Sequence, residues 1–133
     1  MKTKDTLIQI VRNFFKAFDE KDFKKIKKIC IPKTQMIHHN GVTTNTEEMC
    51  KVIEDTINWW PRKRKIWDFD FFSSDNLSVL GLKNQVTFSL PKNKIIEELY
   101  RETWIFNKIN KVWKPVRIHY SSITQQKHSE EVK

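Results

Sequence analysis

Two aspartates in the middle of the chain could carry proton-transfer chemistry. Asp68 and Asp70 stand in the run IWDFDFF, where strand alternation places both carboxylates on one face and aromatic side chains on the other. A carboxylate inside an apolar cavity has a raised pKa and can act as a general base near neutral pH. The alternative is that both aspartates face water or pair with the basic run PRKRK at 61–65. Both strand faces carry apolar residues, so alternation does not decide between these orientations, and we favour the solvent-facing one.

His119 is the third candidate for proton transfer. It lies in a strand whose two faces differ in polarity, with Val116, Ile118 and Tyr120 on one side and Arg117, His119 and Ser121 on the other. If the polar face lines a cavity, His119 is a base or a hydrogen-bond donor to a ligand. If it faces outward, His119 belongs to the surface or to an oligomer contact. The apolar face is the more natural interior, so we favour the outward orientation.

A second set of residues could line a ligand pocket. Its members combine apolar bodies with polar tips, or lie next to such residues: Trp59, Trp104, Tyr120, Glu102, Arg101 and Arg117. Glu102 shares a strand face with Trp104, so it would be a buried acid that needs a partner such as an arginine. Ordinary core packing explains the same aromatic residues equally well.

Metal and phosphate sites are not indicated by the residue spacing. The four histidines do not combine with cysteines or carboxylates at metal-ligand spacing, and we expect neither a metal nor a cofactor. The chain holds only two glycines, Gly41 and Gly81, so it cannot build a glycine-rich phosphate loop. The net charge of +9 permits nucleic-acid binding, but the lysines are spread along the chain. We interpret the run PRKRK as a solvated connection rather than a phosphate-binding patch.

Composition favours one globular domain in a reducing compartment. The chain has 133 residues, which suits a single domain with its own core. The two cysteines, Cys30 and Cys50, do not form a disulfide framework. No apolar run approaches the ~20 residues of a membrane span, and the N-terminus does not resemble a signal peptide. We therefore expect a cytoplasmic protein without a membrane partner.

The period of the apolar residues changes along the chain. Helical spacing predicts helices through Phe18, through Ile29 and from Thr44 to Ile57, with Thr3 or Asp5 as the first N-cap and Thr44 and Glu47 as a capping box. Between the second and third helix, a short strand is expected over 33–39. After Pro61 the period becomes two, which predicts strands over 65–72, 77–82, 85–90, 95–106 and 112–122, with a break at Lys83-Asn84. Helices followed by strands indicate an α+β fold with helices on one face of an antiparallel sheet.

Three local patterns occur in an order that resembles a known family. They are Asp22-Phe23 with Ile29-Cys30 and Pro32, then LSVLG at 77–81, then Trp113, Val116, His119 and Ser121. This order resembles the association domain of calcium/calmodulin-dependent protein kinase II and, more distantly, SnoaL-like proteins of the nuclear transport factor 2-like superfamily. The resemblance implies a cone-shaped domain over residues 1–123. Residues 124–133 lose all periodicity, so we expect a disordered tail there. The arginines that line that family's pocket are replaced here by Trp104 and Tyr120.

The resemblance leaves two functions open. The first is a non-catalytic module that forms a homo-oligomer, most simply a dimer, through its sheet and holds a small molecule in the cone. The second is a small SnoaL-like isomerase, cyclase or hydrolase, because such relatives place a carboxylate or imidazole inside the cone. In that case Asp70, Asp68 or His119 would carry the proton. Nucleic-acid binding by the basic excess is a weaker third hypothesis.

Overall fold

The computed structural model describes residues 2–57 and 60–123. Its elements are α1 (Thr3–Asp19), α2 (Phe23–Ile29), β1 (Gln35–Ile37), β2 (Thr43–Thr44), α3 (Thr46–Asp55), β3 (Arg62–Ser73), β4 (Leu77–Leu90), the short 3-10 helix η1 (Pro91–Asn93), β5 (Lys94–Ile109) and β6 (Val112–Ser122). The predicted tail over 124–133 lies outside the described residues. None of the helices within the described ranges is long and apolar enough to cross a membrane.

The helices form where the spacing predicted them, but two of their caps differ. Residue Lys2 precedes α1 without a side-chain cap, so neither Thr3 nor Asp5 has the predicted role. The capping box of α3 is formed by Asn45 and Glu48, each accepting a backbone N–H of the other, and thus lies one residue later than predicted. The shift occurs because Thr44 belongs to β2 and pairs with β1.

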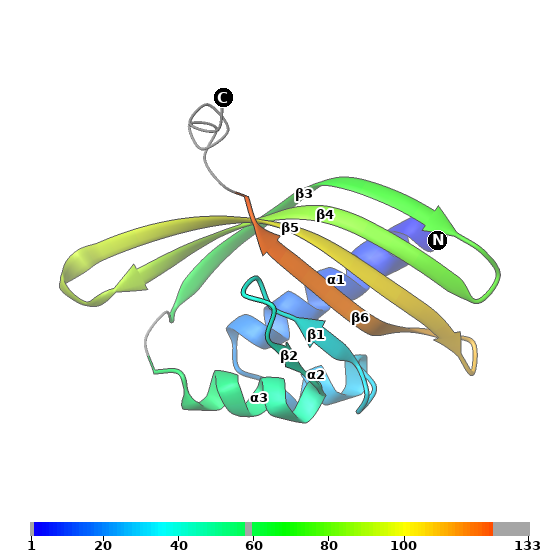
Figure 1. Ribbon diagram of the computed structural model, residues 1–133, viewed down its shortest axis with the longest axis horizontal. Helices are drawn as coiled ribbons and strands as arrows, with labels where there is room; N and C mark the ends of the chain where they lie inside the picture. The colour runs from blue at the N-terminus through cyan, green and yellow to red at the C-terminus, as the bar shows by residue number, and fades with distance from the viewer. Residues whose placement is uncertain (1, 58–59, 124–133) are drawn as a thin grey trace.

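The strands form one sheet in the order β2-β1-β6-β5-β4-β3. Figure 1 shows the long strands β3 to β6 arching over the three helices, which all lie on the same side of the sheet. The pairing of β1 with β6 is parallel and the other pairs are antiparallel, so the sheet is mixed rather than purely antiparallel. Helices packed on one face of this curved sheet confirm the predicted α+β class.

The predicted break at Lys83-Asn84 is wrong, because β4 runs without interruption from Leu77 to Leu90. Both residues pair with β3 on one side and with β5 on the other. The Asn84 side chain is buried and donates to Glu102, so a turn-forming residue type is used here inside the sheet. Tertiary contacts override its local preference.

Two irregularities decide which side chains face the helices. Between Trp67 and Asp70 the register of β3 shifts, and Asp68 has a positive φ of 58°. Because of this bulge, Arg64 points inward before it and Phe69 points inward after it. A second shift, between Ile105 and Phe106 on β5, corresponds to an extra residue on β6.

The core lies between the inner sheet face and α1. Its largest fully buried side chain is Trp104, which makes edge-to-face contacts with Phe14 and Phe15 of α1 at centroid distances of 5.1 and 5.8 Å. Phe106 stacks on the same indole at 5.8 Å. This packing fills one end of the space under the sheet, and the other end remains hollow.

Candidate functional site

A pocket of about 530 Å³ lies between the inner face of the sheet and the helices α1 and α3. Its walls are largely aromatic and aliphatic, and they come from both helices and from the strands: Phe14, Phe15, Phe18, Met49, Val52, Ile53, Trp60, Val86, Phe88, Tyr100, Ile118 and Tyr120. Polar side chains enter the same pocket at separate places: His38, His39, Arg62, Arg64, Asn84, Glu98, Glu102 and Ser122. A concave apolar site with a few converging polar groups is the usual form of a small-molecule site.

The register of the strands orders the pocket from its closed end to its open end. The closed end is the row formed by Leu80, Trp104 and Ile118, all buried. The next row pairs Glu102 with Tyr120. Further along come the row that contains Asn84 and Tyr100 and then the row that contains Arg64 and Glu98. Each of the three rows after Trp104 thus contributes at least one polar side chain to the pocket.

The core encloses the carboxyl group of Glu102, and the residue as a whole is only 3% exposed. Its Oε1 accepts the indole N–H of Trp104 at 2.9 Å, and its Oε2 accepts the Asn84 amide at 2.7 Å. Burial raises the pKa of Glu102, while these two hydrogen bonds and the charge of Arg64 oppose the rise. The other Asn84 amide atom, Oδ1, is buried without a hydrogen-bond partner among the described residues.

His38 follows β1 and contacts two hydroxyl groups. Its Nδ1 lies 2.7 Å from Tyr120 Oη, and its Nε2 lies 2.9 Å from Thr44 Oγ1. Burial lowers the pKa of His38, and the neighbouring His39 lowers it further. Burial also raises the pKa of Tyr120. Both shifts favour a neutral imidazole beside a protonated phenol.

Two arginines of β3 form the cationic part of the pocket. Arg64 binds the Asp19 carboxylate with two nitrogens, at 3.0 and 2.5 Å, and its guanidinium lies 4.1 Å from the Phe15 ring centroid. Arg62 stacks on Trp60 at 3.7 Å from the ring centroid. Burial and the charge of Arg64 lower the pKa of Arg62 to about 10, so it remains charged at neutral pH.

Structure comparison identifies the architecture that holds this pocket. No protein-family model matches the chain, and no curated protein matches its sequence. Among solved structures, a nuclear transport factor 2-like superfamily protein from Salmonella enterica superposes with a TM-score of 0.80 at 19% identity, covering 92% of each chain. The chain has the nuclear transport factor 2-like fold.

Proteins of different functions share this nuclear transport factor 2-like fold. The association domain of CaMKII from C. elegans superposes with a TM-score of 0.77 at 13% identity, covering 89% of this chain and 94% of that one. A hexachlorocyclohexane dehydrochlorinase, LinA-type3 from Novosphingobium barchaimii, gives 0.81 at 11% identity, covering 92% and 87%. The predicted superfamily resemblance is confirmed at the level of the fold, and a fold shared by such proteins does not by itself assign a function.

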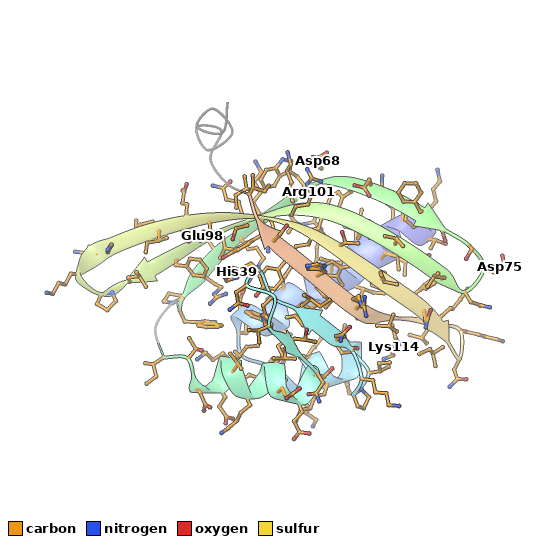
Figure 2. All side chains as sticks on the ribbon, in the orientation of Figure 1. His39, Asp68, Asp75, Glu98, Arg101 and Lys114 are labelled. Atoms are coloured by element: carbon orange, nitrogen blue, oxygen red, sulfur yellow. The ribbon has the colours of Figure 1, made fainter. Side chains whose placement is uncertain are left out.

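The three proton-transfer candidates lie on the outer face of the sheet in this nuclear transport factor 2-like fold. The Asp68 carboxylate is 3.4 Å from Lys83 Nζ and 3.6 Å from Arg101, and Figure 2 shows Asp68 and Arg101 together above the sheet. Asp70 is exposed beside Gly81, and His119 is exposed on β6. These are the solvent-facing orientations favoured from the sequence. A base inside the pocket would therefore have to come from other residues.

The six residues of the predicted pocket set divide between the two faces. Trp104, Glu102 and Tyr120 point inward, and the last two line the pocket. The predicted pocket placement of Arg101 and Arg117 is wrong, because both are exposed on the outer face and alternate with the inward residues. Trp59 lies outside the described residues.

Sequence reasoning missed several polar residues of the pocket. The run PRKRK was interpreted as a solvated connection, yet it begins β3 and directs Arg62 and Arg64 inward while Lys63 and Lys65 face water. Arginine at every second position was the available signal. Within the described residues, no group of three or more His, Cys, Asp or Glu is placed to hold a metal ion.

Proposed function

We propose that this domain binds a small, largely apolar organic molecule in the pocket between the sheet and the helices α1 and α3. The observation that carries the proposal is the pocket itself, about 530 Å³ in volume and walled largely by aromatic and aliphatic side chains. Protein interiors normally pack with few voids larger than a water molecule. A space of this size next to a closely packed core is in the range of ligand sites and far beyond a packing defect.

The placement of the three bases suggested by the sequence, and the surroundings of Glu102 and His38 in the pocket, favour binding over proton transfer. Asp68, Asp70 and His119, the bases suggested by the sequence, are exposed on the other face of the sheet. Inside the pocket, Glu102 is covered and already accepts two hydrogen bonds. His38 has both ring nitrogens within hydrogen-bond distance of hydroxyl groups. A general base needs a lone pair directed at its substrate, so neither group has the arrangement of one.

A tryptophan at the rim of the pocket tests this proposal without overpacking the core. Val52 of α3 lines the pocket and is 52% exposed, so Val52→Trp can project an indole across the opening. Glu54→Trp is the matched control, because Glu54 is an exposed residue of the same helix that does not line the pocket.

The assay is a fluorescence titration with 2-naphthol, a small bicyclic aromatic probe. We expect saturable, one-to-one binding to the natural protein and to Glu54→Trp, with at least a ten-fold loss for Val52→Trp (about 1.4 kcal/mol). Equal affinity in all three proteins would show that the probe binds elsewhere, and no saturable binding at all would refute the proposal.

We propose self-association through the outer sheet face as a second function. An apolar row crosses three strands there, with Phe72, Val79 and Ile105 in register, and Phe72 is 70% exposed. Figure 1 shows the three helices on the opposite side, so none of them covers this row. A second copy of the chain is the proposed occupant, in line with the similarity to an association domain. The bulge and the charges of the edge strand β3 favour pairing through the face rather than the edge.

Light scattering of dilute protein tests the self-association. The proposal predicts a dimer that Ile105→Lys converts to a monomer, because a charge then replaces one of the three apolar side chains of the row. Thr87→Lys is the control, since Thr87 lies on the same face of β4 nearer the β4–β5 hairpin and outside the row. A natural protein that is monomeric across the concentration range would refute this second function and leave ligand binding intact.

A further inference from the structure

The hydrogen-bond direction between His38 and Tyr120 determines what the pocket offers a ligand. Tyr120 Oη lies 2.7 Å from His38 Nδ1, and the other ring nitrogen lies 2.9 Å from Thr44 Oγ1. A neutral imidazole has one N–H and one bare nitrogen, so one hydroxyl donates to the ring and the other accepts from it. Burial lowers the pKa of His38 and therefore favours this neutral form.

The chemistry of the two hydroxyl groups selects the direction. A phenol is much more acidic than an aliphatic alcohol, which makes Tyr120 the stronger donor and Thr44 the better acceptor. The favoured arrangement therefore has Tyr120 O–H donating to Nδ1 and Nε2–H donating to Thr44 Oγ1. In that arrangement the only proton of the Tyr120 hydroxyl is used, and the oxygen retains a lone pair.

Two further rings contact the ring of Tyr120. Tyr100 meets the Tyr120 ring edge to face at a centroid distance of 5.4 Å, and His39 lies 6.0 Å from the same ring. Tyr120 and Tyr100 both line the pocket and are half-buried, so they remain accessible from it. Figure 2 shows His39 on the helix side of the sheet, below the strands that carry Asp68 and Arg101 on their other face. A flat ring that enters here finds stacking surfaces and, at Tyr120, a hydrogen-bond acceptor.

We infer that the pocket selects neutral aromatic molecules that carry a hydroxyl or N–H group, and that Tyr120 Oη accepts the hydrogen bond from that group. This inference rests on the proposed binding function and specifies its ligand class. An aromatic molecule of the same shape without a donor leaves the Tyr120 oxygen desolvated and unpaired, which disfavours it.

Three probes with the same naphthalene ring system separate this inference from the proposed function. 2-Naphthol carries a hydroxyl donor, 2-methoxynaphthalene replaces it by an ether, and naphthalene has neither group. Near neutral pH we expect 2-naphthol to bind about ten-fold more tightly than the other two, the effect of one well-formed hydrogen bond in a desolvated site. Equal binding of all three would overturn the donor preference while supporting the pocket. Binding of none would overturn both proposals.

Two tyrosine variants assign the preference to one oxygen. Tyr120→Phe removes the acceptor and keeps the ring, so the three probes should then bind within about two-fold of one another. Tyr100→Phe makes the same chemical change on the neighbouring ring and should retain the ten-fold preference. If the preference survives in Tyr120→Phe or disappears in Tyr100→Phe, Tyr120 is not the acceptor.

The tautomer of His38 provides a measurement that needs no ligand. Nitrogen-15 NMR of the ring distinguishes a protonated from a bare nitrogen. We expect the proton on Nε2 and a bare Nδ1 near neutral pH. A proton on Nδ1 would mean that His38 donates to Tyr120 and that the Tyr120 hydroxyl points its own proton elsewhere, which would overturn the inference whatever the variants bind.

Discussion

We expect Glu102→Gln to stabilise the protein relative to the natural chain, and to do so more at neutral pH than at acidic pH. The Glu102 carboxyl is enclosed, and burial raises its pKa above the ordinary value of 4.5. The folded protein therefore holds this proton to a higher pH than the unfolded chain does. The contribution of Glu102 to stability is complete below the unfolded pKa and is lost as the pH rises through the folded pKa.

The size of the effect follows from the linkage between proton binding and folding. Between the two pKa values, one extra proton on the folded state lowers the free energy of unfolding by up to about 1.4 kcal/mol per pH unit. Glutamine does not titrate, so the variant lacks this loss. At acidic pH the two side chains are near isosteres, and the Gln carbonyl can still accept the Trp104 N–H. We therefore expect the free energies of unfolding of the two proteins to differ by less than about 1 kcal/mol at acidic pH.

Urea denaturation of both proteins from about pH 4 to about pH 8 measures the difference directly. The other titratable groups, His38 among them, are present in both proteins, so their titration cancels in the comparison. Glu97→Gln is the matched control, since Glu97 is exposed on the outer face of the same strand. The reasoning fails if the stability difference of Glu102→Gln stays flat with pH or shrinks as the pH rises.

Three further predictions concern the stability of the fold, and each is measured as a free energy of unfolding in urea near neutral pH. Asp19→Asn should cost about 2–3 kcal/mol, because the Arg64 side chain is only 10% exposed and its charge loses its partner. An unchanged stability would contradict a role for the pair. Trp104→Phe should cost about 3 kcal/mol through lost volume and the lost donor to the buried carboxyl, and a cost below about 1 kcal/mol would contradict it. Gly81→Ala places a Cβ 2.6 Å from the Asp70 carboxylate, so we expect it to stabilise the protein, by about 0.4–1 kcal/mol, only when Asp70→Ala has removed that carboxylate. If the effects of the two substitutions on the free energy of unfolding simply add, the contact does not limit residue 81.

The orientation of Asp68 and Asp70 shows how much of a strand can be predicted from the local pattern of residues. Alternation placed Asp68 and Asp70 on one face, and both do face outward, but only because a bulge lies between Trp67 and Asp70. A bulge depends on how β3 pairs with β4, and such pairing is non-local. The same limit affected Lys83-Asn84, whose turn-forming types lie inside a continuous strand because Asn84 donates to Glu102.

The pocket required information from distant parts of the chain. His38 and Tyr120 are 82 residues apart, and Asp19 and Arg64 are 45 apart, yet each pair is within hydrogen-bond distance. The histidine pair after β1 carried no distinctive spacing, and the arginines of β3 lay within a run that looks like a solvated connection. Neither signal identifies an inward side chain until the strand order is known.

The order of apolar periods along the chain was sufficient to predict three helices, a long sheet and their α+β packing, because amphipathic spacing is a local property that tertiary contacts seldom overturn. Two of the three helix N-caps were predicted only to within a residue or more, and for α3 the reason is that the cap depends on where β2 ends. Most of the pocket lining, by contrast, was decided by tertiary structure, because among the described residues of the predicted set Glu102 and Tyr120 line the pocket and Arg101 and Arg117 do not. Which strand face turns toward the helices depends on register and bulges, and one residue of shift exchanges every inward side chain for an outward one.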